Sequence, residues 1–110
     1  MGIQAFTKTG NTVVFTANTA APTAVQAVSS TLGGNQYRII NTSSNVTVFL
    51  GYGTTADEAN TAAAVVTTTS PAFPLLPGTD EILSFVPNAY FTGITNSGNA
   101  TIYVTPGDGL

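Results

Sequence analysis

The sequence predicts an all-β domain: an antiparallel β-sandwich or jelly roll of about eight or nine short strands, with one short helix or structured loop near residues 54–66. Runs of β-branched and aromatic residues recur about every ten residues and are separated by Gly, Pro, Asn and Ser. Several runs alternate apolar and polar residues, as half-buried antiparallel strands do. The 110 residues contain no linker, charge block or repeat, so we expect a single domain over residues 1–110.

The expected strands share this composition and end at residues that favour turns. In chain order they are Ile3–Phe6, Thr12–Ala17, Ala24–Val28, Gln36–Asn41, Val46–Tyr52, Phe73–Leu76, Glu81–Phe85, Tyr90–Ile94 and Thr101–Thr105. Alternation is clear in the fifth run, where Val46, Val48 and Leu50 share one face. In the last run, Ile102 and Val104 share one face of the strand, and Tyr103 and its flanking threonines lie on the other face. These patterns predict strands with one buried face.

The segment Thr54–Val66 departs from the strand pattern because it is rich in alanine. Thr54 or Thr55 is suitable as an N-cap residue, since its hydroxyl can accept a bond from a free backbone N–H. Asp57 and Glu58 would then lie in the first turn, where the helix dipole favours acidic side chains. This segment therefore predicts the short helix or structured loop.

Composition excludes several kinds of function. The chain has no histidine or cysteine, so ordinary zinc, haem and iron–sulfur sites and His-dependent nucleophilic catalysis are not expected. We expect neither a cofactor nor enzymatic activity. With 2 basic residues and a net charge of -3, binding to nucleic acid or to an anionic membrane is also not expected. The longest apolar run, Ala62–Val66, is too short for a membrane span, and no basic segment opens a secretory signal.

Two pairs of neighbouring acidic residues could in principle serve glycoside hydrolysis or calcium binding. They are Asp57–Glu58 and Asp80–Glu81. Adjacent strand residues point to opposite faces, so neighbours do not converge by themselves. Helix capping explains the first pair and a turn explains the second. The short motifs Gly51–Gly53 and Gly107–Gly109 are interpreted as bends after strands.

A few residues are candidates for a protein interface. Arg38 is interpreted as a solvent-facing strand residue, with an ion pair to one of the acids as the alternative. Tyr90 and Phe91 are adjacent, so one of them should face outward, and Tyr52 lies between two glycines. The candidate interface residues are Phe6, Arg38, Tyr52, Asp57, Glu58 and Tyr90. Core packing is the default for Phe6, Phe15, Phe49, Phe85, Phe91 and Tyr103.

Charged residues make up only 6% of the chain, whereas ordinary soluble domains have about a quarter. Charged side chains normally supply solubility and prevent pairing at sheet edges. Their scarcity, together with the abundance of Thr and Asn, indicates a surface that is covered in the working state. This pattern favours a component of an assembly.

Several segments resemble small structural proteins of tailed bacteriophages. They are Arg38–Thr42, Val46–Gly53, Leu75–Phe85, Pro87–Thr92 and Gly98–Leu110. The resemblance covers about two-thirds of the chain, mainly residues 36–110. The family is that of the capsid decoration proteins, also called cement or staple proteins, of short-tailed phages, which have a jelly-roll core. The matching segments are structural and include no catalytic motif.

The resemblance implies a viral structural protein on the outer capsid surface of the virion, made in the host cytoplasm. Such proteins bind the mature, expanded shell and bridge neighbouring major capsid proteins. The resemblance also implies a homodimer, with a trimer as the alternative. Residues 54–66 and Ile3–Phe6 are candidate capsid contacts, because neither segment is needed for a minimal sandwich.

Two other classes of function remain open. One is a head-fibre or tailspike-type module that binds a receptor or carbohydrate, for which Tyr52 with Asp57 is a conceivable pair. The other is a small β-domain hydrolase that uses the acidic pairs.

Overall fold

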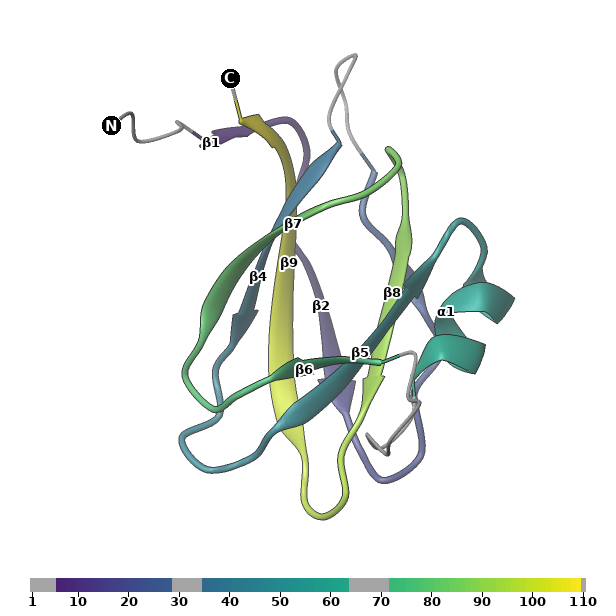
Figure 1. Ribbon diagram of the computed structural model, residues 1–110, viewed down its shortest axis with the longest axis vertical. Helices are drawn as coiled ribbons and strands as arrows, with labels where there is room; N and C mark the ends of the chain where they lie inside the picture. The colour runs from purple at the N-terminus through teal and green to yellow at the C-terminus, as the bar shows by residue number, and fades with distance from the viewer. Residues whose placement is uncertain (1–5, 29–34, 64–71, 110) are drawn as a thin grey trace.

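The computed structural model describes residues 6–28, 35–63 and 72–109, with the backbone alone at residues 6, 7, 108 and 109. Within these residues the chain forms nine strands and one helix (Figure 1). The elements are β1 (Phe6–Lys8), β2 (Val13–Ala17), β3 (Val25–Gln26), β4 (Gln36–Asn41), β5 (Val48–Gly53), α1 (Ala56–Ala62), β6 (Phe73–Leu75), β7 (Asp80–Ser84), β8 (Tyr90–Ile94) and β9 (Ala100–Gly109).

The strands form two antiparallel sheets. Sheet A has the order β1-β9-β4-β7, with β2 also paired to β9, and sheet B has the order β3-β8-β5-β6. Four of the pairs are nested along the chain, namely β2 with β9, β3 with β8, β4 with β7 and β5 with β6. This is one long hairpin, rolled so that β4 also pairs with β9 and β5 with β8. The pattern is that of a jelly roll, and the fold prediction is confirmed.

The strand boundaries differ from the expected ones in a few places. The last strand is longer than predicted because β9 pairs with β4 along much of its length, and with β2 and β1 in turn on its other side. The third strand is shorter than Ala24–Val28, since only Val25 and Gln26 pair with β8. Of the first predicted strand, Phe6 lies in β1 and residues 3–5 lie outside the described part of the chain.

The core lies between the inner faces of the two sheets. Val48 and Leu50 from sheet B and Ile102 and Val104 from sheet A are fully buried, as their alternation predicts. The rings of Tyr37 and Phe91 meet edge to face across the core, with centroids 4.8 Å apart. The buried apolar residues are Phe15, Ala17, Ala27, Tyr37, Ile39, Val48, Leu50, Leu75, Ala89, Phe91, Ala100, Ile102 and Val104.

Buried hydrogen bonds of Asn41 join the two sheets. Asn41 ends β4, and its Nδ2 donates to the carbonyl oxygens of Val46, at 2.9 Å, and of Leu75 in β6, at 3.1 Å. Its Oδ1 accepts from the backbone N–H of Ser43 at 3.0 Å. The amide of Asn41 therefore fixes the corner where the chain passes from sheet A to sheet B.

The hydroxyl of Tyr37 makes a second buried connection. It donates to the carbonyl oxygen of Val86 and accepts from the N–H of Ala89 at 3.1 Å, so it holds the segment between β7 and β8. Burial raises the pKa of Tyr37, which outweighs the opposite effect of the bond from Ala89.

Helix α1 begins where the sequence predicted a cap. Thr55, rather than Thr54, is the N-cap residue, and its Oγ1 accepts from the N–H of Glu58 at 3.1 Å. Glu58 Oε1 accepts in turn from the N–H of Thr54 at 2.8 Å, which resembles a capping box. The predicted helix is therefore confirmed over Ala56–Ala62, and residues 64–66 lie outside the described part.

Helix α1 packs on the outer face of sheet B, beside β5 and β8 (Figure 1). Gly51 makes this approach possible, because a Cβ there would lie 2.3 Å from the carbonyl oxygen of Ala59. The interpretation of Gly51–Gly53 as a bend after a strand is therefore wrong. Both glycines lie within β5, and the missing side chains leave room for the helix. Gly107–Gly109 likewise lie within β9.

Candidate interaction surface

The outer face of sheet A is an open surface, because the described helix packs on β5 and β8 of sheet B. Its residues alternate with buried ones along β2, β9 and β4, and each is exposed or half-buried. We call this surface the A face. It consists of Val14, Thr16, Gln36, Arg38, Ile40, Asp80, Ile82, Ser84, Thr101, Tyr103 and Thr105.

Apolar side chains cross the A face in neighbouring rows. The strand register places Val14 beside Tyr103 and Tyr103 beside Ile40. In the next row, Arg38 lies between Thr105 and Ile82. Val14, Tyr103 and Ile82 are 51%, 42% and 50% exposed. Large apolar side chains are thus left in solvent on neighbouring strands, which is typical of an interaction surface.

The charge on the A face is internally neutralised. Arg38 Nε donates to both carboxylate oxygens of Asp80, at 3.0 and 3.1 Å, and its Nη2 donates to Oδ2 as well. These hydrogen bonds lower the pKa of Asp80 and raise that of Arg38. Arg38 and Asp80 are diagonal neighbours on β4 and β7, because Arg38 faces Ile82 in the register. Arg38 is thus solvent-facing, as interpreted, and also forms the ion pair given as the alternative.

The outer face of sheet B is occupied by the protein itself. Ala59 of α1 is fully buried against it. Thr92 of β8 is also fully buried, and its Oγ1 donates to the carbonyl oxygen of Pro22 at 2.8 Å. The helix and the segment that contains Pro22 therefore take up surface that sheet A leaves open.

The aromatic interface candidates lie away from the A face. Tyr52, a candidate interface residue, packs inward, with its ring centroid 4.8 Å from that of Phe85 and 6.2 Å from that of Phe91. Alternation along β5 explains this, since Tyr52 follows buried Val48 and Leu50 at even spacing. Tyr90 is half-buried on β8, opposite Gly53. The side chain of Phe6 lies outside the described part.

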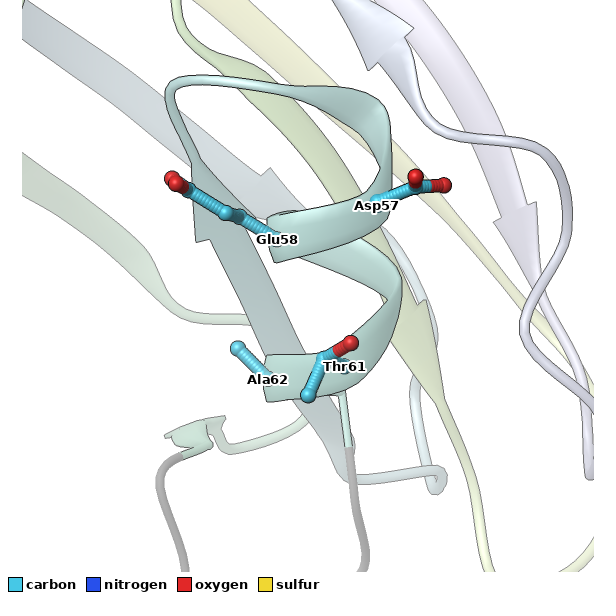
Figure 2. Close-up of a pocket in the computed structure, with 4 residues that line it drawn as sticks. All are labelled: Asp57, Glu58, Thr61 and Ala62. Carbon is cyan, nitrogen blue, oxygen red and sulfur yellow. The ribbon is translucent and has the colours of Figure 1, made fainter.

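Asp57 and Glu58 line a shallow, open depression of about 340 Å³ beside α1, together with Thr61 and Ala62. Figure 2 shows that the two carboxylates point to opposite sides of the helix. Glu58 is held by the N–H and hydroxyl of Thr54, which lower its pKa. This arrangement caps a helix and does not direct two carboxylates at one substrate atom.

The other acidic pair is also separated. Asp80 is bound by Arg38, while Glu81 follows it on β7 and faces Ile39, at an inward position of the register. Among the described residues, no three or more acidic, histidine or cysteine side chains gather where they could hold a metal ion. No described helix has the length and apolarity needed to cross a membrane.

The exposed apolar members of the A face were not recognised from the sequence. Tyr103 was assigned to the core by default, but it is on the outer face of β9. The signal was present, because Tyr103 alternates with Ile102 and Val104. Val14 and Ile82 lie in predicted strands, but only the pairing of the strands places their side chains on one surface.

Comparisons with protein-family models, with curated proteins and with solved structures gave no match to this chain. Function is therefore inferred from the jelly-roll architecture, the composition and the A face.

Proposed function

We propose that this protein is a viral structural protein that decorates the outer surface of the mature bacteriophage capsid. In this role it bridges major capsid proteins and stabilises the expanded shell. The observation that supports the proposal best is the A face, a broad, open sheet surface with apolar rows and no unpaired charge among its eleven residues. The resemblance of residues 36–110 to decoration proteins points the same way.

The chemistry of the A face suits a permanent protein partner. Burying a threonine hydroxyl requires one hydrogen-bond partner, whereas burying an unpaired charge costs far more. Arg38 and Asp80 already neutralise each other, so the pair can be covered without leaving a lone ion. Val14, Tyr103 and Ile82 would provide apolar contacts in the interface.

Binding of this kind would stabilise a shell by mass action. A protein that binds only the expanded lattice favours that lattice by about 2.7 kcal/mol per site when its free concentration is 100 times the Kd. The effect is repeated at every site on the shell. A protein without enzymatic activity could therefore strengthen a capsid considerably.

Co-sedimentation with shells of the phage that encodes the protein tests the proposal. Compact procapsids and expanded empty heads are compared, and bound copies are counted per shell. We expect saturable binding to expanded heads alone, at a number commensurate with the lattice. Absence of binding to either shell would overturn the proposal.

A pair of variants tests the role of the A face in this assay. Tyr103→Thr replaces a central apolar side chain of the A face, and we expect it to weaken binding to expanded heads about tenfold or more. Leu76→Thr is the matched control, because Leu76 is exposed but lies outside the A face. Equal binding by both variants would show that the A face is not the capsid contact.

The alternative, a head-fibre or tailspike-type module that binds a receptor or carbohydrate, is compatible with a jelly roll. The pair that suggested it, Tyr52 with Asp57, does not offer a stacked ring beside a carboxylate, because Tyr52 packs on Phe85 and Phe91. A glycan-array screen distinguishes the two functions, since a decoration protein should give no specific signal.

A further inference from the structure

Strand β7 forms an open edge of sheet A. It pairs with β4 on one side, and among the described residues no strand pairs with it on the other. The ladder is bounded by two backbone bonds, from Asn41 N to Thr79 O at 3.0 Å and from Phe85 N to Asn35 O at 2.9 Å. These two bonds fix which residues of β7 point toward β4.

Hydrogen-bonded pairs alternate along an antiparallel ladder, so Glu81 and Leu83 bond to β4. The N–H and C=O groups of Asp80, Ile82 and Ser84 therefore point away from β4, toward the open edge. Each of these three residues offers one donor and one acceptor in strand geometry. Such an edge is a ready template for another strand.

The sequence of β7 leaves all the backbone donors of this edge in place. Natural edge strands are protected by proline, charged side chains, bulges or short length. Residues 80–84 contain no proline or glycine, and their charged residues are Asp80, which is paired with Arg38, and Glu81. The edges of sheet B differ, because β6 has three residues including Pro74 and β3 has two residues. Of these edges, β7 is the longest, and it contains no proline.

Strand β2 is the other five-residue edge of sheet A, and it provides a comparison. The chain leaving β2 is tied to sheet B, since Asn18 forms a bridge with Ile94 and its carbonyl oxygen accepts from Thr95 N at 2.8 Å. This attachment closes one end of the β2 edge. Within the described parts of the chain, no such attachment is found along residues 80–84.

We propose that β7 pairs antiparallel with β7 of a second copy of this chain, about a two-fold axis at Ile82. In this register Ile82 faces Ile82 of the partner subunit and Asp80 faces Ser84 of the partner subunit. All three outward-pointing residues then exchange backbone hydrogen bonds. Two-fold pairing of identical surfaces is the commonest form of homo-oligomer.

The register is compatible with the charges as well as with the backbone geometry. Asp80 faces a serine and Glu81 faces Leu83 of the partner subunit, so no like charges lie opposite each other. Asp80 is already paired with Arg38 on its own chain. At the two-fold axis, the half-exposed side chain of Ile82 would contact Ile82 of the partner subunit, and this contact would remove apolar surface from water.

The pairing would join two A faces side by side in one continuous sheet. This geometry would give a dimer two capsid contacts on one side, which raises avidity under the proposed function. The inference itself rests on the β7 edge alone, and it stands whether or not the protein binds a capsid.

A cysteine substitution tests the register directly, because the chain has no native cysteine. Hydrogen-bonded residues of an antiparallel pair have Cα atoms about 5.5 Å apart, within the range of a disulfide. Under mild oxidation we expect Ile82→Cys to give a covalent dimer. Val14→Cys is the matched control, since Val14 is equally exposed on the other open edge. Equal cross-linking of both variants, or none at Ile82→Cys, would overturn the proposal.

A proline substitution tests the hydrogen bonds. Ile82→Pro removes an N–H that points away from β4, and proline is tolerated at such edge positions. In sedimentation velocity we expect a wild-type dimer, a monomer for Ile82→Pro and a dimer for Val14→Pro. If Ile82→Pro does not fold, Ile82→Lys serves instead, because it places two like charges at the axis. A monomeric wild type, a dimeric Ile82→Lys or an open-ended fibre would each contradict the two-fold pairing.

Discussion

The two sheets have similar inner faces and very different outer faces. On sheet B, glycines at positions 51 and 53 leave room for α1, and the backbone of the helix comes within 2.3 Å of where a Cβ of Gly51 would lie. On sheet A, Val14, Tyr103 and Ile82 stand out into solvent. The absence or presence of side chains thus decides whether the protein covers a sheet itself or leaves it for a partner.

This difference separates stability from function within one fold. The outer face of sheet B contributes to folding, since α1 and the segment that contains Pro22 are packed on it. The A face supports no further described element, so its side chains are free to serve an interface. Substitutions on the two faces should therefore have different consequences, which the following variants test.

The largest effect should come from a side chain under the helix. Gly51→Ala places a methyl group against the backbone of Ala59 and Ala63, which lie 2.3 and 2.4 Å from its Cβ. Backbone cannot rotate away as a flexible side chain can, so we expect a loss of about 3 kcal/mol in the free energy of unfolding. Urea denaturation measures this change.

Gly78→Ala is the control for Gly51→Ala. Gly78 has a positive φ of 72° and no atom within 4 Å of an added Cβ. Its substitution should cost about 1–2 kcal/mol through backbone conformation alone. If Gly51→Ala destabilised the protein less than Gly78→Ala, this result would contradict the close packing of α1 on sheet B.

The second largest effect should come from the connection between the sheets. Asn41→Ala leaves the carbonyl oxygens of Val46 and Leu75 and the N–H of Ser43 without their side-chain partner. We expect a loss of about 2 kcal/mol, because buried polar groups would lose their bonds. Thermal unfolding should show a lower Tm. An unchanged Tm would mean that Asn41 does not hold the corner between the sheets.

Tyr37→Phe should have a smaller effect of about 1 kcal/mol at neutral pH, because the Val86 carbonyl and the Ala89 N–H lose one partner. The wild type should also lose stability in alkali. The pKa of Tyr37 in the folded state lies above the ordinary tyrosine value of about 10, so the folded protein holds the hydroxyl proton more tightly than the unfolded chain does. This contribution is complete below pH 10 and decreases as the pH rises through the folded-state pKa.

The alkaline effect is measured by comparing wild type and Tyr37→Phe in urea at pH 8 and at pH values above 10. The difference in stability between them should shrink as the pH rises. Parallel curves over the whole range would contradict the assignment of this titration to Tyr37.

The strands and the helix could be predicted because their signals are local. Alternation identified the buried positions of β5 and β9, and the order of threonines and acids predicted the cap of α1. The role of Gly51 could not be predicted, because a Gly-Tyr-Gly sequence can form a bend or can leave room for a helix that packs on the strand. Only the packing of α1 on β5 distinguishes them.

The A face was beyond prediction for a related physical reason. It combines β2, β9, β4 and β7, which are distant in sequence and become neighbours only when the hairpin is rolled. Arg38 was recognised as a candidate, but its partner followed from the β4–β7 register, which places Asp80 diagonally across from it. Tyr52 shows the converse, because it was a candidate interface residue between two glycines, whereas the alternation of β5 turns its side chain inward.

The smallest effect on stability should come from the A face itself. Val14→Thr keeps a β-branched residue on β2 and removes only exposed apolar surface, so the free energy of unfolding should change by no more than about 0.5 kcal/mol. Ile102→Thr, on the inner face of the neighbouring strand, should cost about 2 kcal/mol or more, because it places a hydroxyl in the core. Chemical denaturation of both variants measures the contrast. If Val14→Thr were as damaging as Ile102→Thr, the outer face of sheet A would be part of the folding core, and its side chains would not be available to a partner.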